Sequence, residues 1–80
     1  MENKEQNVKA ETALIASDLK SSGFGVEILA RYDAVRVRLT RKVSALPWQV
    51  RVALYQAGYE DGAYRITEAC GSVFVRAVVA

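Results

Sequence analysis

Few residues in this 80-residue chain are suited to catalysis. The sequence has no histidine, the commonest general base, and its one cysteine, Cys70, stands beside Gly71 with no imidazole to activate it. The adjacent acids Glu60 and Asp61 precede Gly62 and indicate a solvated turn, because one acidic pair without other oxygen ligands makes a weak metal site. We therefore expect no enzyme activity, no metal and no cofactor.

The arginines suggest chemistry of another kind. The stretch from Val35 to Lys42 reads VRVRLTRK, so a period of two puts apolar side chains on one side and mainly cations on the other. In a half-buried strand this pattern gives a wet face that carries positive charge. Arginine suits bidentate and stacked contacts better than lysine does. The stretch therefore indicates either a solvated strand or a surface for an anionic ligand.

Charge and cysteine content bear on the environment of the chain. The formal net charge is +2, but residues 1–30 hold three lysines and five acids, whereas residues 31–80 hold seven arginines and one lysine against four acids. A lone cysteine forms no internal disulfide, and the polar start MENKEQNVK does not have the pattern of a signal peptide. No apolar run reaches the roughly 18 residues that a membrane span needs. We expect a cytoplasmic protein without membrane contact.

Hydrophobic periodicity predicts the elements that position these residues. Apolar side chains recur at helical spacing after a start, residues 1–5, that we expect to fray. Gly23 and Gly58 follow the two helical segments as stop residues, and Pro47 opens the second helix. The expected elements are a helix over 8–22, strands over 26–32 and 35–42, a helix over 47–57, and strands over 63–69 and 72–79.

The order αββαββ indicates an internal repeat within one domain over residues 1–80, with units at about 8–42 and 44–79. The segment Leu-x-x-x-Gly that ends the first helix recurs 35 positions later, followed in each case by an aromatic residue. Two αββ units most simply form a four-stranded antiparallel sheet with both helices on one face, a two-layer α+β fold. A domain-swapped or dimeric arrangement would satisfy the same pattern.

The face of the sheet without helices is the first candidate surface. Cations there could hold phosphates, and an exposed aromatic ring could stack on a base. The alternative is a solvated face on which long side chains lie across the sheet and protect its strands from aggregation. The residues predicted to bind nucleic acid are Arg31, Arg36, Arg38, Lys42, Arg65, Phe74 and Arg76.

A second apolar stripe on the second helix is the other candidate surface. Trp48, Val52 and Tyr55 recur at helical spacing, and the matching positions of the first helix are small or polar. The stripe could fold over the neighbouring helix or the loop at 60–62, or it could contact a partner, because Trp and Tyr are typical interface anchors. Leu14 on the first helix could join it.

These two surfaces predict a small, non-enzymatic nucleic-acid-binding protein, homodimeric through the Trp48 stripe. The pattern is compatible with either DNA or RNA. The alternative is a protein-interaction module, such as a small inhibitor or assembly factor, in which the Trp48 stripe docks on a different protein and the arginines meet its acidic surface.

Overall fold

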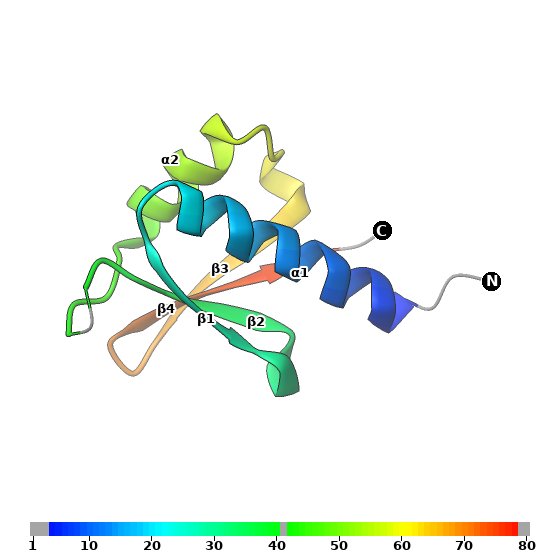
Figure 1. Ribbon diagram of the computed structural model, residues 1–80, viewed down its shortest axis with the longest axis horizontal. Helices are drawn as coiled ribbons and strands as arrows, with labels where there is room; N and C mark the ends of the chain where they lie inside the picture. The colour runs from blue at the N-terminus through cyan, green and yellow to red at the C-terminus, as the bar shows by residue number, and fades with distance from the viewer. Residues whose placement is uncertain (1–3, 41, 79–80) are drawn as a thin grey trace.

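Alternating helical and strand-forming segments produce an α+β fold, which the computed structural model describes for residues 4–40 and 42–78 (Figure 1). The predicted fold class and element order are confirmed. Short 3-10 turns, η1 (Ala30–Tyr32) and η2 (Asp61–Ala63), precede the second and third strands. The helices and strands are α1 (Lys4–Ser21), β1 (Gly25–Leu29), β2 (Ala34–Arg38), α2 (Pro47–Gln56), β3 (Tyr64–Ala69) and β4 (Ser72–Ala77).

Helix α1 buries the stripe that its periodicity predicts. Thr12, Ile15 and Leu19 are at most 2% exposed, because spacings of three and four residues put them on one face of the helix. The helix begins at Lys4, four residues before the predicted start. Part of the end that we expected to fray is thus helical, and residues 1–3 of that prediction lie outside the described residues.

Both helices end in the same backbone motif. The closing glycine takes a positive φ in each case, +98° at Gly23 and +97° at Gly58. The N–H of the residue after the glycine donates to the carbonyl five positions earlier, at 3.1 Å after α1 and 3.0 Å after α2. This is a Schellman motif, which the predicted repeat places at equivalent positions of the two αββ units.

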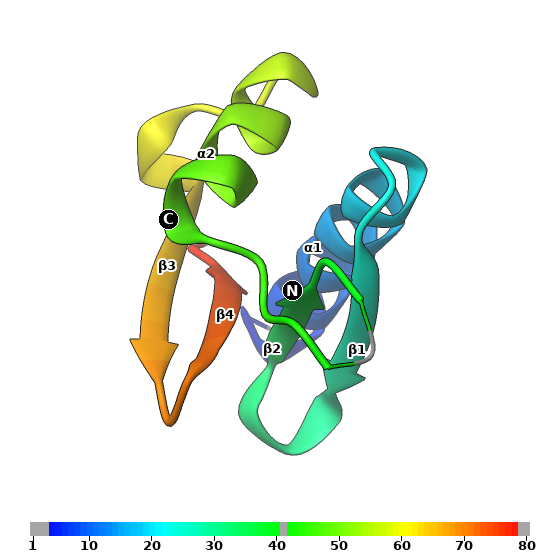
Figure 2. The same cartoon turned by 90° about the vertical axis from the view of Figure 1, so that its left-hand side faces the viewer.

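The four strands form one antiparallel sheet in the order β1-β2-β4-β3. Each hairpin thus contributes one central strand and one edge strand, and β2 and β4 join the hairpins at the centre. Both helices lie on the same side of the sheet, α1 along β1, β2 and β4 and α2 near β3 (Figures 1 and 2). Among the described residues, no helix lies on the opposite face of the sheet.

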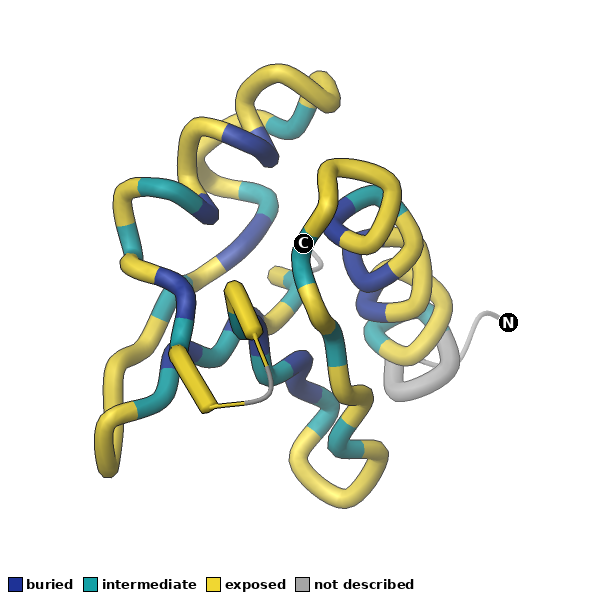
Figure 3. Tube along the Cα trace, turned by 60° about the vertical axis from the view of Figure 1, so that its left-hand side comes forward, coloured by how far each residue is buried: buried dark blue, intermediate teal, exposed yellow. Residues whose placement is uncertain are grey.

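The core lies between the helix layer and the sheet (Figure 3). Central strands supply paired valines, which the register sets opposite one another across β2 and β4. The radius of gyration, 11.8 Å, agrees with the value of about 11.6 Å expected for a compact chain of this length. The largest fully buried side chains are Ile15, Leu19, Val35, Val37, Val50, Leu54, Val73 and Val75.

The strands of the first hairpin are shorter than predicted. Strand β1 ends at Leu29, because Ala30–Tyr32 form η1 and Asp33 then takes a left-handed conformation with φ +50°. Strand β2 ends at Arg38. The chain then reverses in a turn in which the N–H of Leu39 donates to the carbonyl of Val43 at 2.8 Å. Arg31 and Lys42, which we expected on the sheet, therefore lie in turns beside it.

Ser44 connects the two hairpins beyond the end of the sheet. It forms an isolated antiparallel bridge with Arg38 of β2. Its Oγ accepts a hydrogen bond from the N–H of Val73 in β4 at 3.2 Å. The segment before α2 is thus fixed to both central strands at one end of the sheet.

Candidate nucleic-acid interface

Two rows of side chains cross all four strands on the face opposite the helices. Side chains alternate between faces along a strand, so residues paired across the sheet share a face. The first row consists of Glu27, Arg36, Phe74 and Thr67. The second row consists of Leu29, Ala34, Arg76 and Arg65. The open face defined by these rows therefore combines cations with apolar side chains.

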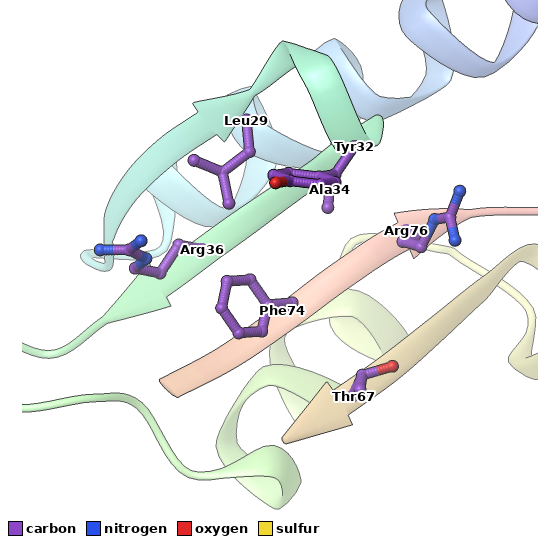
Figure 4. Close-up of a pocket in the computed structure, with 7 residues that line it drawn as sticks. All are labelled: Leu29, Tyr32, Ala34, Arg36, Thr67, Phe74 and Arg76. Atoms are coloured by element: carbon purple, nitrogen blue, oxygen red, sulfur yellow. The ribbon is translucent and has the colours of Figure 1, made fainter. Parts of the chain in front are cut away.

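A hollow of about 380 Å³ lies on this open face, where Ala34 places the smallest side chain of either row (Figure 4). The hollow is mainly apolar in its centre and has guanidinium groups at its ends. Its lining residues are Leu29, Tyr32, Ala34, Arg36, Thr67, Phe74 and Arg76. We call it the Ala34 hollow.

Two aromatic rings border the Ala34 hollow, although the sequence indicated only one. Phe74 lies on this face in β4, as its place in the alternation predicts, but it is half-buried and not exposed as we expected. Tyr32 enters from η1 and is 61% exposed. The alternation over 26–32 predicts Tyr32 at the end of a strand and gives no sign of its place beside the hollow. The turn brings its ring close to Ala34 and Leu29 (Figure 4).

Arg36 lies between an acid and an aromatic ring. Its Nη2 is 3.7 Å from Glu27 Oε1, and Nη2 of Arg38 is 3.8 Å from Glu27 Oε2. The guanidinium carbon of Arg36 is 5.8 Å from the centroid of Phe74, within cation–π distance. These contacts hold the guanidinium groups over the sheet, and their partial exposure makes each ion pair weak.

Arg65 and Arg76 stand directly opposite each other on β3 and β4. Both are exposed, and among the described residues neither forms an ion pair. Like charges at opposite positions of two antiparallel strands destabilise the pairing. An anion bound between the two guanidinium groups would remove this repulsion, so the pair is a candidate phosphate site.

The remaining predicted cations lie near the two ends of the open face. Arg38 and Lys42 line a second, smaller hollow of about 200 Å³ with Ser44 and the β3–β4 turn. Arg31 in η1 has its guanidinium carbon 5.8 Å from the centroid of Tyr32. Thus Arg36, Phe74 and Arg76 meet at the Ala34 hollow, and Arg65 lies beside it. Arg38, Lys42 and Arg31 lie at its periphery.

The Trp48 stripe is exposed on the outer side of α2. Trp48, Val52 and Tyr55 are 62%, 46% and 75% exposed, and Leu14 on α1 is 54% exposed. Tyr55 borders a hollow that Glu60 and Asp61 also line. Most of the surface of Tyr55 nevertheless remains in solvent. Within the part of the chain that the structure describes, each of the three stripe residues keeps roughly half or more of its surface in solvent.

The other residues considered for chemistry form no site. Cys70 is exposed in the β3–β4 turn, where it takes φ +52°. In residues 4–40 and 42–78, no group of three or more histidine, cysteine, aspartate or glutamate side chains is placed to hold a metal ion. No described helix combines the length and apolar character that crossing a membrane requires.

No protein family, no characterised protein and no solved structure matches this chain.

Proposed function

We propose that the protein binds nucleic acid, without catalysis, through the open face of its sheet. The observation that carries this proposal is the opposed pair Arg65 and Arg76 beside the aromatic Ala34 hollow. Phosphates need cations and bases offer flat rings, so a surface with both features fits a nucleic acid. The lone exposed cysteine is consistent with a reducing, cytoplasmic environment.

The cations on the open face have graded roles in this proposal. Arg65 and Arg76 make the principal phosphate contacts, because no acid in the described chain neutralises them. Arg36 and Arg38 contribute after exchanging Glu27 for a phosphate. Lys42 and Arg31 extend the contact at the ends of the open face, and Phe74 provides a ring for stacking.

A salt titration of binding tests the proposal. Labelled DNA and RNA oligonucleotides are titrated with protein at about 50 and 200 mM salt, and fluorescence anisotropy reports binding. We expect affinity to fall steeply with salt. The double substitution Arg65→Ala and Arg76→Ala should weaken binding similarly on all sequences and flatten the slope by about two.

Arg51→Ala combined with Lys20→Ala is the matched control. It removes the same charge from exposed positions on the helices. The control should lower affinity much less than the sheet substitutions, because its cations lie away from the open face. Equal losses in the two double variants would show only a general charge effect, and no binding at low salt would refute the proposal.

The exposed Trp48 stripe supports a second proposal, a protein contact through α2. The partner we favour is another copy of the chain, because an 80-residue domain has a small core and homodimers are the commonest oligomers. A stripe that contacts a different protein would instead make the chain an interaction module. The oligomeric state separates these two cases.

A further inference from the structure

We infer that the Ala34 hollow receives one unpaired base, so that the ligand of the open face is a single strand and not a duplex. This inference rests on the proposed function, since the phosphates that flank the base must bind the arginines. It goes further by assigning the apolar centre of the open face to the base and by naming the strand type.

The size of the hollow suits one ring system. Its volume, about 380 Å³, lies near the lower end of the roughly 300–1000 Å³ of small-ligand sites. Leu29, Ala34, Tyr32 and Phe74 make its central lining largely apolar. A sugar or phosphate would lose its hydration there without recovering hydrogen bonds, whereas a base can place its flat surface against the rings.

The arrangement of the charges matches a single strand around one base. Figure 4 shows Leu29, Tyr32 and Phe74 around the opening, with Arg36 toward one end and Arg76 toward the other. A nucleotide within a strand has a phosphate on each side. With the base in the hollow, one phosphate reaches Arg76 and the facing Arg65, and the other reaches Arg36.

A duplex does not offer the same contact. Its bases are paired and stacked, so their flat surfaces are covered, and extruding one costs a few kcal/mol. A duplex could touch the arginines through its phosphates alone and would leave the rings of Tyr32 and Phe74 without a base to stack on. The aromatic hollow therefore favours binding of a single strand over a duplex by about the free energy of stacking one base.

The test compares three probes of equal sequence length, each about eight nucleotides long, within the usual site size for single strands. They are a fluorescein-labelled single strand, the same strand with abasic residues throughout, and the duplex. DNA and RNA forms of the intact strand are compared as separate arms. The wild-type protein should bind the intact strand about 5- to 150-fold more tightly than the abasic strand, the range equivalent to stacking one base.

Ala34→Leu fills the hollow without changing charge. It should bring the ratio of affinities for intact and abasic strands close to one by weakening binding of the intact strand. Ala57→Leu is the control, because it enlarges an exposed alanine at the end of α2. Should Ala34→Leu fail to fold by circular dichroism, Phe74→Leu removes a ring from the half-buried position and should lower the same ratio.

The outcomes separate this inference from the proposed function. Salt-sensitive binding with equal affinity for intact strand, abasic strand and duplex would keep the phosphate surface and overturn the base site. A ratio that Ala34→Leu and Phe74→Leu both leave unchanged would also overturn it. Absence of binding to every probe at low salt would refute the proposed function itself.

Discussion

Glu27 occupies a position that bears directly on anion binding. Its two carboxylate oxygens lie within 4 Å of Arg36 and Arg38, at 3.7 and 3.8 Å, on the face proposed to bind phosphate. The carboxylate occupies one guanidinium nitrogen of each arginine, and its negative charge repels a phosphate that approaches them. In the proposed binding mode, Glu27 would compete with a phosphate for Arg36 and Arg38.

Replacing Glu27 with glutamine should strengthen binding. The substitution removes the repulsion and releases two arginines, and exposed ion pairs of this kind contribute about 0.2–1 kcal/mol, so affinity should rise by up to about fivefold. Anisotropy titration at low salt measures the change. Glu68→Gln is the control. Glu68 is exposed on β3, but it follows Thr67 of the open face and therefore points to the opposite face of the sheet. Equal gains in both variants would contradict a local role of Glu27.

Tyr59 connects the end of α2 to α1. Its hydroxyl donates a hydrogen bond to Asp18 Oδ2 at 2.6 Å. Burial raises the pKa of the Tyr59 hydroxyl above its ordinary value of 10, and the hydrogen bond and the negative charge of Asp18 raise it further. The protonated hydroxyl is therefore the form that the folded protein stabilises.

Tyr59→Phe should lower the free energy of unfolding by about 1–2 kcal/mol, the scale of a hydrogen bond to a charged group at a partly exposed site. A raised folded-state pKa means that this contribution is complete below the unfolded pKa, about 10, and is lost as pH rises toward the folded pKa. The stability difference between wild type and variant should stay constant from pH 7 to about 10 and then shrink by about 1.4 kcal/mol per pH unit. Urea denaturation across this range measures it. A difference that grows above pH 10 would contradict the assignment.

At the residue scale, alternation along the strands was sufficient to place Arg36, Phe74 and Arg76 on one face. This succeeds because the side-chain period of a strand is two and the register pairs the same face of each strand. The position of Tyr32 beside the hollow was not predicted, because the alternation of residues 26–32 continues through η1 and indicates a strand there. Its role depends on a turn whose backbone hydrogen bond joins Asp33 to Ala30.

The ends of the elements differ in how strongly the sequence specifies them. Both helix ends were predicted correctly to within one residue, since a left-handed closing position favours glycine. The end predicted for β2 was wrong, because Leu39 and Thr40 continue the alternation of the strand beyond its actual end at Arg38. The turn there depends on the Oγ1 of Thr40, which accepts a hydrogen bond from the N–H of Val43 at 3.1 Å.

Gly58→Ala tests the contribution of the α2 end. At φ +97° an alanine is strained, and no atom lies within 4 Å of the added Cβ, so the cost is conformational and not steric. The free energy of unfolding should fall by about 1–2 kcal/mol, as measured by urea denaturation. Gly62→Ala is the control, because Gly62 has equal space without a positive φ and should change stability by no more than about 0.5 kcal/mol. Equal losses in the two variants would contradict this explanation.

At the scale of the whole molecule, the two proposed surfaces lie on different layers. The open face belongs to the sheet, and the Trp48 stripe belongs to the outer side of α2. A dimer formed through α2 would leave both open faces accessible. Such a dimer could engage one long strand at two places and gain avidity without any new contact.

Trp48→Ala should dissociate the proposed dimer and leave the fold intact. Trp48 is 62% exposed in one chain, so its loss removes little internal packing, whereas a buried interface tryptophan contributes about 2 kcal/mol or more, equivalent to about 30-fold in dimer affinity. Sedimentation velocity across a range of concentrations measures the change. Leu39→Ala, at a 42% exposed leucine in the turn after β2, should leave the dimer unchanged. A wild-type protein that remains monomeric at every concentration would contradict self-association.

The most direct test of the central claim is to map the binding surface by NMR. A ¹⁵N-labelled protein is titrated with a short single-stranded oligonucleotide, and backbone amide shifts are followed. The largest changes should occur at Tyr32, Arg36, Phe74 and Arg76, and Arg51 on α2 should be nearly unaffected. Changes concentrated on α2, with the strands of the open face unchanged, would contradict the claim that the sheet binds nucleic acid.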